Sequence, residues 1–375
     1  MRTGARYFSW RELTALIVAN KLSMLTTYAP ILTGAPATRD AWLSAWLAAG
    51  IALVFALIPF HLLLRFPGHT LFTINMKVLG GWAGRLLNLA YAGLFLYLAA
   101  VSTRMFTEVF LVAMLPETPS FAINLLMTLL VVTGVLGGME VLARLADMVT
   151  PVILVTILLL VMIGSTLMEL DRLLPLFEFG VGPMLHQTLT PIGIFGEISW
   201  TVALGMPFLR QPRDALKAIG AATLINGLFV SLGAAMLIAM MGPELIDREL
   251  FPTLTAIRMI RLAEFLTRIE WLLATLWVGS IYVKLGLLIW GAARALRESL
   301  GLTHRRLTVL AVASVGAVWS HYLFADTAEM MAYFLPENNL LLSLTPALLL
   351  PLLTLAVALV RGLRESPPAG GADHG

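Results

Sequence analysis

The chain has 375 residues, of which 59% are hydrophobic and only 13% are charged, and its formal net charge at pH 7 is +3. Soluble domains carry roughly 25% charged residues, so this composition excludes a soluble globular protein and indicates an integral membrane protein. The chain has no cysteine, which excludes disulfides, thiolate catalysis and iron–sulfur clusters.

Apolar segments of about 20 residues recur along the chain, and each is long enough to cross a hydrocarbon core of roughly 30 Å. They predict ten transmembrane helices over about 10–33, 41–64, 84–114, 119–138, 149–168, 190–209, 215–241, 269–296, 307–325 and 338–362. Strand-like alternation is lacking, so the predicted fold is all-α, with one membrane domain over 1–364. Residues 365–375 contain paired prolines and paired glycines and predict a short disordered tail.

The first predicted span is interrupted in mid-membrane by a polar stretch made of Asn20, Lys21, Leu22 and Ser23. Lys21 could fill a ligand cavity, pair with the carboxylate of Glu197 on another span, or reach the cytoplasmic side. The residues alone leave these three alternatives open.

The third predicted span carries Arg104 and Glu108, which stand four residues apart, share a helix face and can form an ion pair. We interpret this pair as structural and near the outer end of the span. Tyr97 on the same span could, together with Asn20 and Ser23, orient a small polar ligand. Polar side chains also hydrogen-bond neighbouring helices for packing alone, and this alternative stays open.

The sixth predicted span combines two glycines and a carboxylate within an apolar stretch, over Gly193, Ile194, Phe195, Gly196 and Glu197. Glycine loosens a helix, and an ionisable group at membrane depth costs several kcal/mol unless something offsets it. The combination predicts a broken helix whose freed backbone and carboxylate line a binding cavity. Glu197 could carry a coupling proton, bind a ligand ammonium, or form a salt bridge with Lys21 or Lys284.

The spans divide into two sets of five, repeat one over about 10–168 and repeat two over about 190–362, and the first span of each set is interrupted. Interruptions at matching positions of two halves are typical of an inverted-repeat transporter fold with a site at the membrane midplane. Residues 251–262 alternate apolar and basic residues at helical spacing, which predicts an amphipathic helix that could form an outer lid. Residues 71–79 predict a second interfacial helix, on the cytoplasmic side.

Basic residues are distributed unevenly between the two sides that ten spans define. Sixteen Lys and Arg residues lie on the side that holds both termini, against six on the other side. The positive-inside rule therefore places both termini and the tail in the cytoplasm. Since topology accounts for the positive charge, we expect the lipid bilayer and no nucleic acid as a partner.

A series of short motifs extends over almost the whole chain. They are Arg65-Phe66-Pro67-Gly68, Phe195-Gly196-Glu197, Pro207-Phe208-Leu209 with Pro212, Phe251-Pro252-Thr253, residues 265–270, and Trp277-Val278-Gly279 with Lys284. In their order and spacing the sequence resembles the B subunit of GerA-type spore germinant receptors, a branch of the amino acid–polyamine–organocation transporter superfamily. The chain departs from that family in span 1, where Asn20 to Met24 replace a glycine-containing turn.

The resemblance implies a LeuT-like five-plus-five inverted repeat with a germinant site between spans 1, 3, 6 and 8. It also implies A and C partner subunits in the spore inner membrane, an amino acid as the favoured germinant, and germination with ion release as the output. Within the superfamily, a lysine such as Lys284 can take the place of a sodium ion. The alternative function is an autonomous proton-coupled amino acid transporter with Glu197 as the proton carrier. Metal-binding, nucleophile-elbow and P-loop motifs are missing from the sequence, so we expect neither enzymatic activity nor a cofactor.

Overall fold

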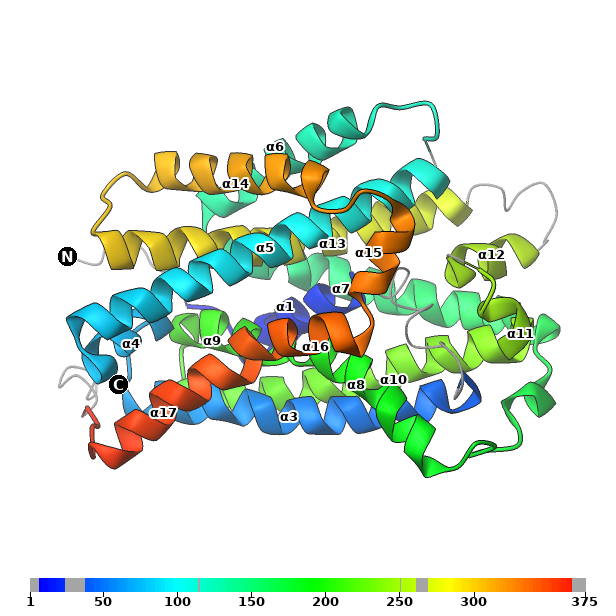
Figure 1. Cartoon of the computed structure of the whole chain (residues 1–375), viewed down its shortest axis with the longest axis horizontal. Helices are drawn as coiled ribbons and strands as arrows, with labels where there is room; N and C mark the ends of the chain where they lie inside the picture. Colours follow the sequence, from blue (N-terminus) through cyan, green and yellow to red (C-terminus); the bar gives the residue numbers. More distant parts are fainter. Residues whose placement is uncertain (1–6, 24–37, 114, 250, 261–268, 366–375) are drawn as a thin grey trace, which may run out of the picture.

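A computed structural model of the chain describes residues 7–23, 38–113, 115–249, 251–260 and 269–365. Most of the long helices run along one common direction and form a single bundle (Figure 1). The α-helices of the described residues are α1 (Trp10–Leu22), α3 (Ala41–Arg65), α4 (Leu71–Leu79), α5 (Gly81–Ala113), α6 (Ser120–Gly137), α7 (Met139–Gly164), α8 (Val181–Phe195), α9 (Glu197–Gly205), α10 (Ala215–Met241), α11 (Pro243–Ile246), α12 (Pro252–Met259), α13 (Ile269–Leu300), α14 (Arg305–Tyr322), α15 (Thr327–Tyr333), α16 (Pro336–Leu344) and α17 (Leu350–Val360). Each of the ten predicted apolar segments overlaps at least one of these helices.

Eight helical segments among the described residues are long and apolar enough to cross a membrane, or nine if α14 and α15, which meet at 112°, form one bent span. The first predicted span, 10–33, is described only as far as Ser23, so its outer half lies outside the described residues. The predicted starts of two spans are too late, because α7 begins at Met139 and α8 at Val181. Hydropathy marks the part of a helix in the hydrocarbon core, whereas the helix itself continues into the polar interface.

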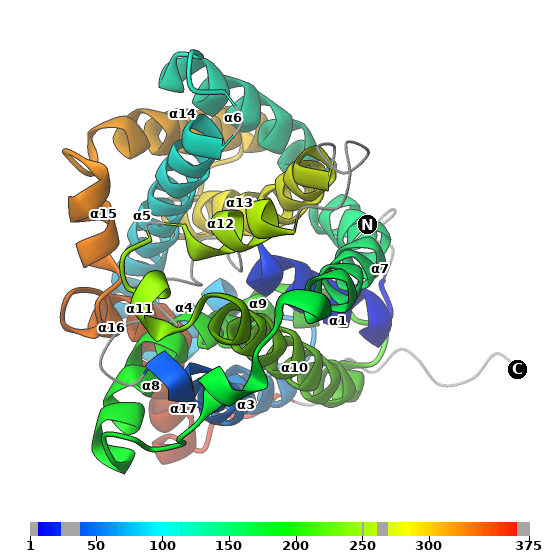
Figure 2. The ribbon, with the colours of Figure 1, turned by 90° about the vertical axis from the view of Figure 1, so that its right-hand side faces the viewer.

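Helix α1 lies in the centre of the bundle. It begins with a capping box in which the Glu12 backbone N–H donates to Ser9 Oγ and the Ser9 backbone N–H donates to the Glu12 carboxylate. Every residue from Leu13 to Leu22 is buried, and α7, α9, α10 and α13 surround the helix (Figure 2). A helix that is buried on all sides is a core element, so its polar residues must find partners inside the protein.

Helices α8 and α9 form one span with an interruption at Gly196, which confirms the predicted break in span 6. All residues of α9 are buried, and this helix packs against α1 and α3. The backbone N–H of Gly196 donates to the carbonyl of Ile192 (2.8 Å), and that of Ser199 donates to the carbonyl of Gly196 (2.9 Å). Because Gly196 keeps right-handed helical dihedrals (φ −54°, ψ −24°), the interruption tightens one turn without reversing the chain.

Two short helices lie at opposite ends of the bundle (Figure 1). Helix α4 has the bounds predicted for the interfacial helix over 71–79. Helix α12 matches most of the helix predicted over 251–262, of which residues 261 and 262 lie outside the described residues. The predicted tail also lies outside them, apart from Glu365, whose backbone N–H donates to the carbonyl of Arg65 (2.9 Å).

Candidate functional site

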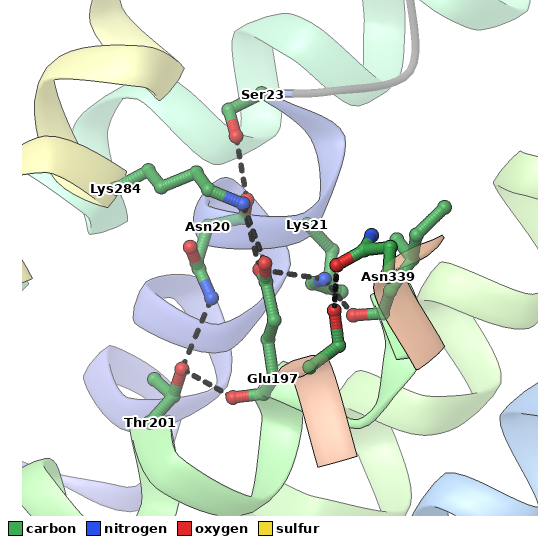
Figure 3. Close-up of polar contacts among 9 residues, drawn as sticks. Asn20, Lys21, Ser23, Glu197, Thr201, Lys284 and Asn339 are labelled. Carbon is green, nitrogen blue, oxygen red and sulfur yellow. Dashed lines mark hydrogen bonds and ion pairs between the residues drawn. The ribbon is translucent and has the colours of Figure 1, made fainter. Parts of the chain in front are cut away.

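The polar end of α1, with Asn20 and Lys21, meets the interruption between α8 and α9 at one carboxylate, that of Glu197 at the start of α9 (Figure 3). Lys284 Nζ on α13 lies 2.8 Å from both carboxylate oxygens of Glu197. Lys21 Nζ on α1 lies 2.8 Å from Glu197 Oε2 and also donates to the main-chain carbonyl of Ile194 at the end of α8. A single carboxylate therefore joins three helices that lie far apart in the sequence.

All three charged side chains of this cluster, Lys21, Glu197 and Lys284, are buried, with exposed fractions of 2%, 8% and 1%. Buried charges are costly unless they are paired and hydrogen-bonded, and here each ammonium group has the carboxylate within hydrogen-bond distance. With all three groups ionised the cluster holds two positive charges and one negative charge, a surplus of +1. In this ionisation state the site is a buried cationic centre.

The structure decides between alternatives that the sequence leaves open. Lys21 pairs with Glu197 and does not reach the cytoplasmic side, and Glu197 has both candidate lysines as partners instead of one. A proton or a ligand as a further partner of Glu197 stays a prediction, as does the replacement of sodium by Lys284. The predicted pair on α5 is confirmed, with Arg104 and Glu108 2.6 Å apart.

Polar contacts on either side of Lys21 fix the end of α1. The Asn20 amide Nδ2 donates to Thr201 Oγ1 (3.0 Å), which itself donates to the carbonyl of Glu197 (2.8 Å). Ser23 Oγ donates to the carbonyl of Asn20 (2.6 Å), and the carbonyl of Ser23 accepts from Trp277 Nε1 (2.5 Å). Leu22, between them, is a buried apolar residue with 4% exposure.

The two glycines of span 6 lie against the last membrane-spanning segment. A Cβ at Gly193 would come within 3.3 Å of Ser343 Cβ on α16, and a Cβ at Gly196 within 3.3 Å of Ala347 Cβ in the π-helical turn that follows. Phe195, which lies between them, is buried with 1% exposure. These glycines thus allow close packing of the helices beside the cluster.

Tyr97 is the one predicted ligand-orienting residue that the structure places in a different contact group. It is half-buried on α5, and its ring packs against Trp319 (centroids 5.4 Å apart) and Tyr333 (5.9 Å). These two aromatic neighbours of Tyr97 belong to α14 and α15, whereas the lysines and Glu197 belong to α1, α9 and α13. A ligand role for Tyr97 stays a prediction.

Sequence reasoning did not assign a role in the site to Thr201, Trp277, Asn339 or Ser343. Ser343 Oγ donates to Asn339 Oδ1 (2.7 Å) on α16, the helix that approaches Gly193. A signal was present for Thr201, which stands four residues after Glu197 and so shares its helix face. Asn339 and Ser343 have the same spacing within an apolar span. Among the described residues, His, Asp and Glu side chains form no group of three that could hold a metal ion.

Comparison with solved structures shows the fold. The chain is similar to Mhp1, a nucleobase-cation-symport-1 family transporter solved in a closed conformation with bromovinylhydantoin bound, with a TM-score of 0.70 and 14% identity over 95% of this chain and 79% of that chain. It is also similar to MhsT, solved in complex with L-phenylalanine, with a TM-score of 0.62 and 15% identity over 96% of this chain and 90% of that chain. The protein is therefore a multi-pass membrane protein with the predicted LeuT-like transporter fold.

Sequence comparison then gives the family. The sequence profile described as spore germination protein matches residues 7–328, and the chain belongs to this family. Spore germination protein KB of Bacillus subtilis (strain 168) is 30% identical over 266 residues, which are 70% of each chain. The putative spore germination protein YfkT of the same organism is 25% identical over 339 residues, covering 88% of this chain and 92% of the relative. The predicted family resemblance is confirmed.

Proposed function

We propose that this chain is the membrane subunit of a spore germinant receptor, which senses a small germinant beside the cluster of Lys21, Glu197 and Lys284. The observation that carries the proposal is the convergence of the polar end of α1 and the interrupted α8–α9 span on one buried carboxylate. Helix ends at such interruptions offer backbone N–H and carbonyl groups to a small polar ligand. An amino acid is the first class of germinant to test, and the fold relative MhsT was solved with L-phenylalanine bound.

Ligand binding would act by changing the balance between two arrangements of the bundle. A ligand that interacts with Glu197 or with either lysine changes the ion pairs that hold α1, α9 and α13 together. Such a ligand shifts the populations of two states by its difference in affinity for them. In the proposed receptor, A and C subunits convert this shift into ion release and germination. The chain would reside in the spore inner membrane with both termini in the cytoplasm, as a single domain of two repeats.

A second candidate is an autonomous proton-coupled amino acid transporter in which Glu197 carries the proton. The likeness to transporters over nearly the whole chain supports this alternative. Liposomes that contain this chain alone distinguish the two proposals. Counterflow of a labelled amino acid would support the transporter, whereas ligand binding without counterflow would support the receptor.

Thermal unfolding of the purified chain with amino acids, nucleosides and sugars tests the placement of the site. We expect at least one germinant to raise the melting temperature of the wild type and to have a weaker effect on Gly196→Ala, because the added Cβ lies 3.1 Å from the carbonyl of Ile192. Gly93→Ala is the matched control, since no heavy atom lies within 4 Å of a Cβ at that position. If no compound stabilises the wild type, or if both variants respond as it does, the proposed site is wrong.

A further inference from the structure

Lys21 makes the set of contacts that a primary ammonium group of a free ligand would make. Its Nζ lies 2.8 Å from Glu197 Oε2 and donates to the main-chain carbonyl of Ile194. A carboxylate oxygen together with a carbonyl at an interrupted helix supplies two strong acceptors for one ammonium group. The side chain of Lys21 reaches these acceptors from α1, across the interface between α1 and the α8–α9 span.

The second lysine already neutralises the carboxylate. Lys284 donates to both oxygens of Glu197, so these two residues form a complete bidentate pair with no net charge. Lys21 adds the surplus positive charge described above. Another cationic group brought to this site would therefore meet a buried centre that is already positive.

We infer that Glu197 Oε2 and the Ile194 carbonyl form a subsite for a primary ammonium group, and that Lys21 of the same chain fills it. This inference rests on the proposed function and changes its ligand class, because it excludes zwitterionic amino acids, the first class to be tested there, from the wild-type site. The wild-type site takes a small ligand that brings no ammonium group and is neutral or singly negative. A zwitterionic amino acid gains access to the subsite only when the Lys21 side chain is removed.

The neighbours of Lys21 explain why it acts as a fixed occupant. Asn20 is tied to Thr201, and the Ser23 carbonyl accepts from Trp277, so the backbone is held on both sides of the lysine. The side chain is 2% exposed and cannot exchange freely with water. Removing it beyond Cβ leaves the Glu197–Lys284 pair intact and opens a space equal in size to a propylammonium ion.

Chemical rescue of Lys21→Ala tests the inference. Melting temperatures of the purified full chain are measured with n-propylammonium and with n-propanol, an uncharged molecule of nearly the same shape, at equal ionic strength. We expect propylammonium to raise the melting temperature of Lys21→Ala by at least about 2 °C and n-propanol to have no comparable effect. The wild type and Lys21→Met should not respond, because in both the side chain still fills the space. Lys77→Ala, at an exposed lysine, is the matched control.

Ligand selectivity gives a second readout that a purely structural lysine would not change. L-Alanine and propionate share a carbon skeleton and differ in the ammonium group. We expect L-alanine to bind Lys21→Ala at least about tenfold more tightly than it binds the wild type, while propionate gains nothing. A tenfold change corresponds to about 1.4 kcal/mol.

The inference is overturned if propylammonium acts equally on the wild type and Lys21→Ala, or on neither. Recovery of folded Lys21→Ala only in the presence of propylammonium would support it, and failure to recover this variant under both conditions would contradict it. Failure of the germinant screen on the wild type is a separate result, because the rescue is measured on the variant without any germinant.

Discussion

At the scale of single residues, the decisive feature is that one carboxylate serves two lysines. Glu197 accepts from Lys284 through both oxygens and from Lys21 through one of them. The three side chains are therefore not equivalent. Removing a lysine leaves a neutral pair, whereas removing the carboxylate leaves two buried ammonium groups close together.

This asymmetry makes a prediction for Glu197→Gln. The variant should lower the free energy of unfolding by about 3–5 kcal/mol, the usual cost of leaving a buried charge without its partner. Lys21→Met should stay much closer to the wild type, because Glu197 and Lys284 remain paired. Denaturant unfolding of the purified chain in detergent measures both values, and equal losses in the two variants would contradict this account of the cluster.

At the scale of helices, glycine sets how closely α4 approaches α5. A Cβ at Gly84 would lie 2.4 Å from Met76 Cα and 2.6 Å from the carbonyl oxygen of Asn75, both backbone atoms of α4. Behind this contact, Asn75 Nδ2 donates to Asn88 Oδ1 (2.8 Å) and Thr354 Oγ1 donates to Asn75 Oδ1 (2.9 Å). Helix α4 is thus hydrogen-bonded to both α5 and α17.

Gly84→Ala should therefore displace α4 and lower the free energy of unfolding by about 1–3 kcal/mol, as overpacking does in other cores. The same substitution at Gly93, on the same helix but with open space around it, should be neutral or stabilising by up to about 1 kcal/mol. Thermal melts compare the two, and hydrogen exchange over 71–79 reports the displacement. An unchanged melt for Gly84→Ala would show that α4 can shift at little cost.

The C-terminal segment contacts α4 through an ion pair between Glu365 and Lys77. A hydrogen bond from Lys77 (2.6 Å), together with the nearby charges of His69 and Lys77, lowers the pKa of the Glu365 carboxyl below its ordinary value. A carboxyl whose pKa is lower in the folded state stabilises that state above its unfolded pKa of about 4.3, and this contribution is lost as the pH falls through the lowered pKa.

The attachment of Glu365 to α4 should therefore hold at neutral pH and loosen in acid, below about pH 4. Hydrogen exchange of the Glu365 amide, which donates to the carbonyl of Arg65, follows this attachment directly. Relative to the intrinsic exchange rate at each pH, Glu365→Gln should protect this amide less at neutral pH, and that protection should no longer change between neutral pH and acid. Identical exchange in the wild type and the variant at neutral pH would mean that the ion pair does not hold the segment.

At the scale of the whole molecule, the cluster joins the two predicted repeats. Lys21 belongs to the first repeat, while Glu197 and Lys284 belong to the second, so their contacts link α1 to α9 and α13. Aromatic rings add to this junction, with Trp277 on α13 packed against Phe106 on α5 (centroids 5.0 Å apart). A change at the cluster therefore reaches helices of both halves.

If Lys284 takes the place of a sodium ion, the protein should be independent of sodium. Replacing sodium by potassium or choline at constant ionic strength should leave the melting temperature and the affinity for any germinant unchanged, because a buried ammonium already supplies the positive charge. A melting temperature that rises specifically with sodium would contradict the proposed role of Lys284.

The sequence by itself determined the membrane class, the helical fold and the two places where the apolar pattern is broken. These properties depend on local composition, because a hydrocarbon core demands long apolar helices and makes every exception costly. The sequence also predicted the bounds of the amphipathic helix α4, because the pattern of apolar and polar residues that indicates this helix lies within nine residues. The hydropathy pattern did not give the true starts of α7 and α8, which lie before the apolar segments that predicted them.

Only the tertiary structure decided which charges meet. Lys21 and Glu197 are more than a hundred residues apart in the sequence, and Glu197 and Lys284 are 87 residues apart. No local sequence pattern fixes the rotation of α1 against α9 and α13. That rotation follows from packing, in which α1 is buried on every side and its end is held by Thr201 and Trp277. The same packing placed Tyr97 against Tyr333 and Trp319, because side-chain direction depends on the neighbours of a helix and not on its sequence alone.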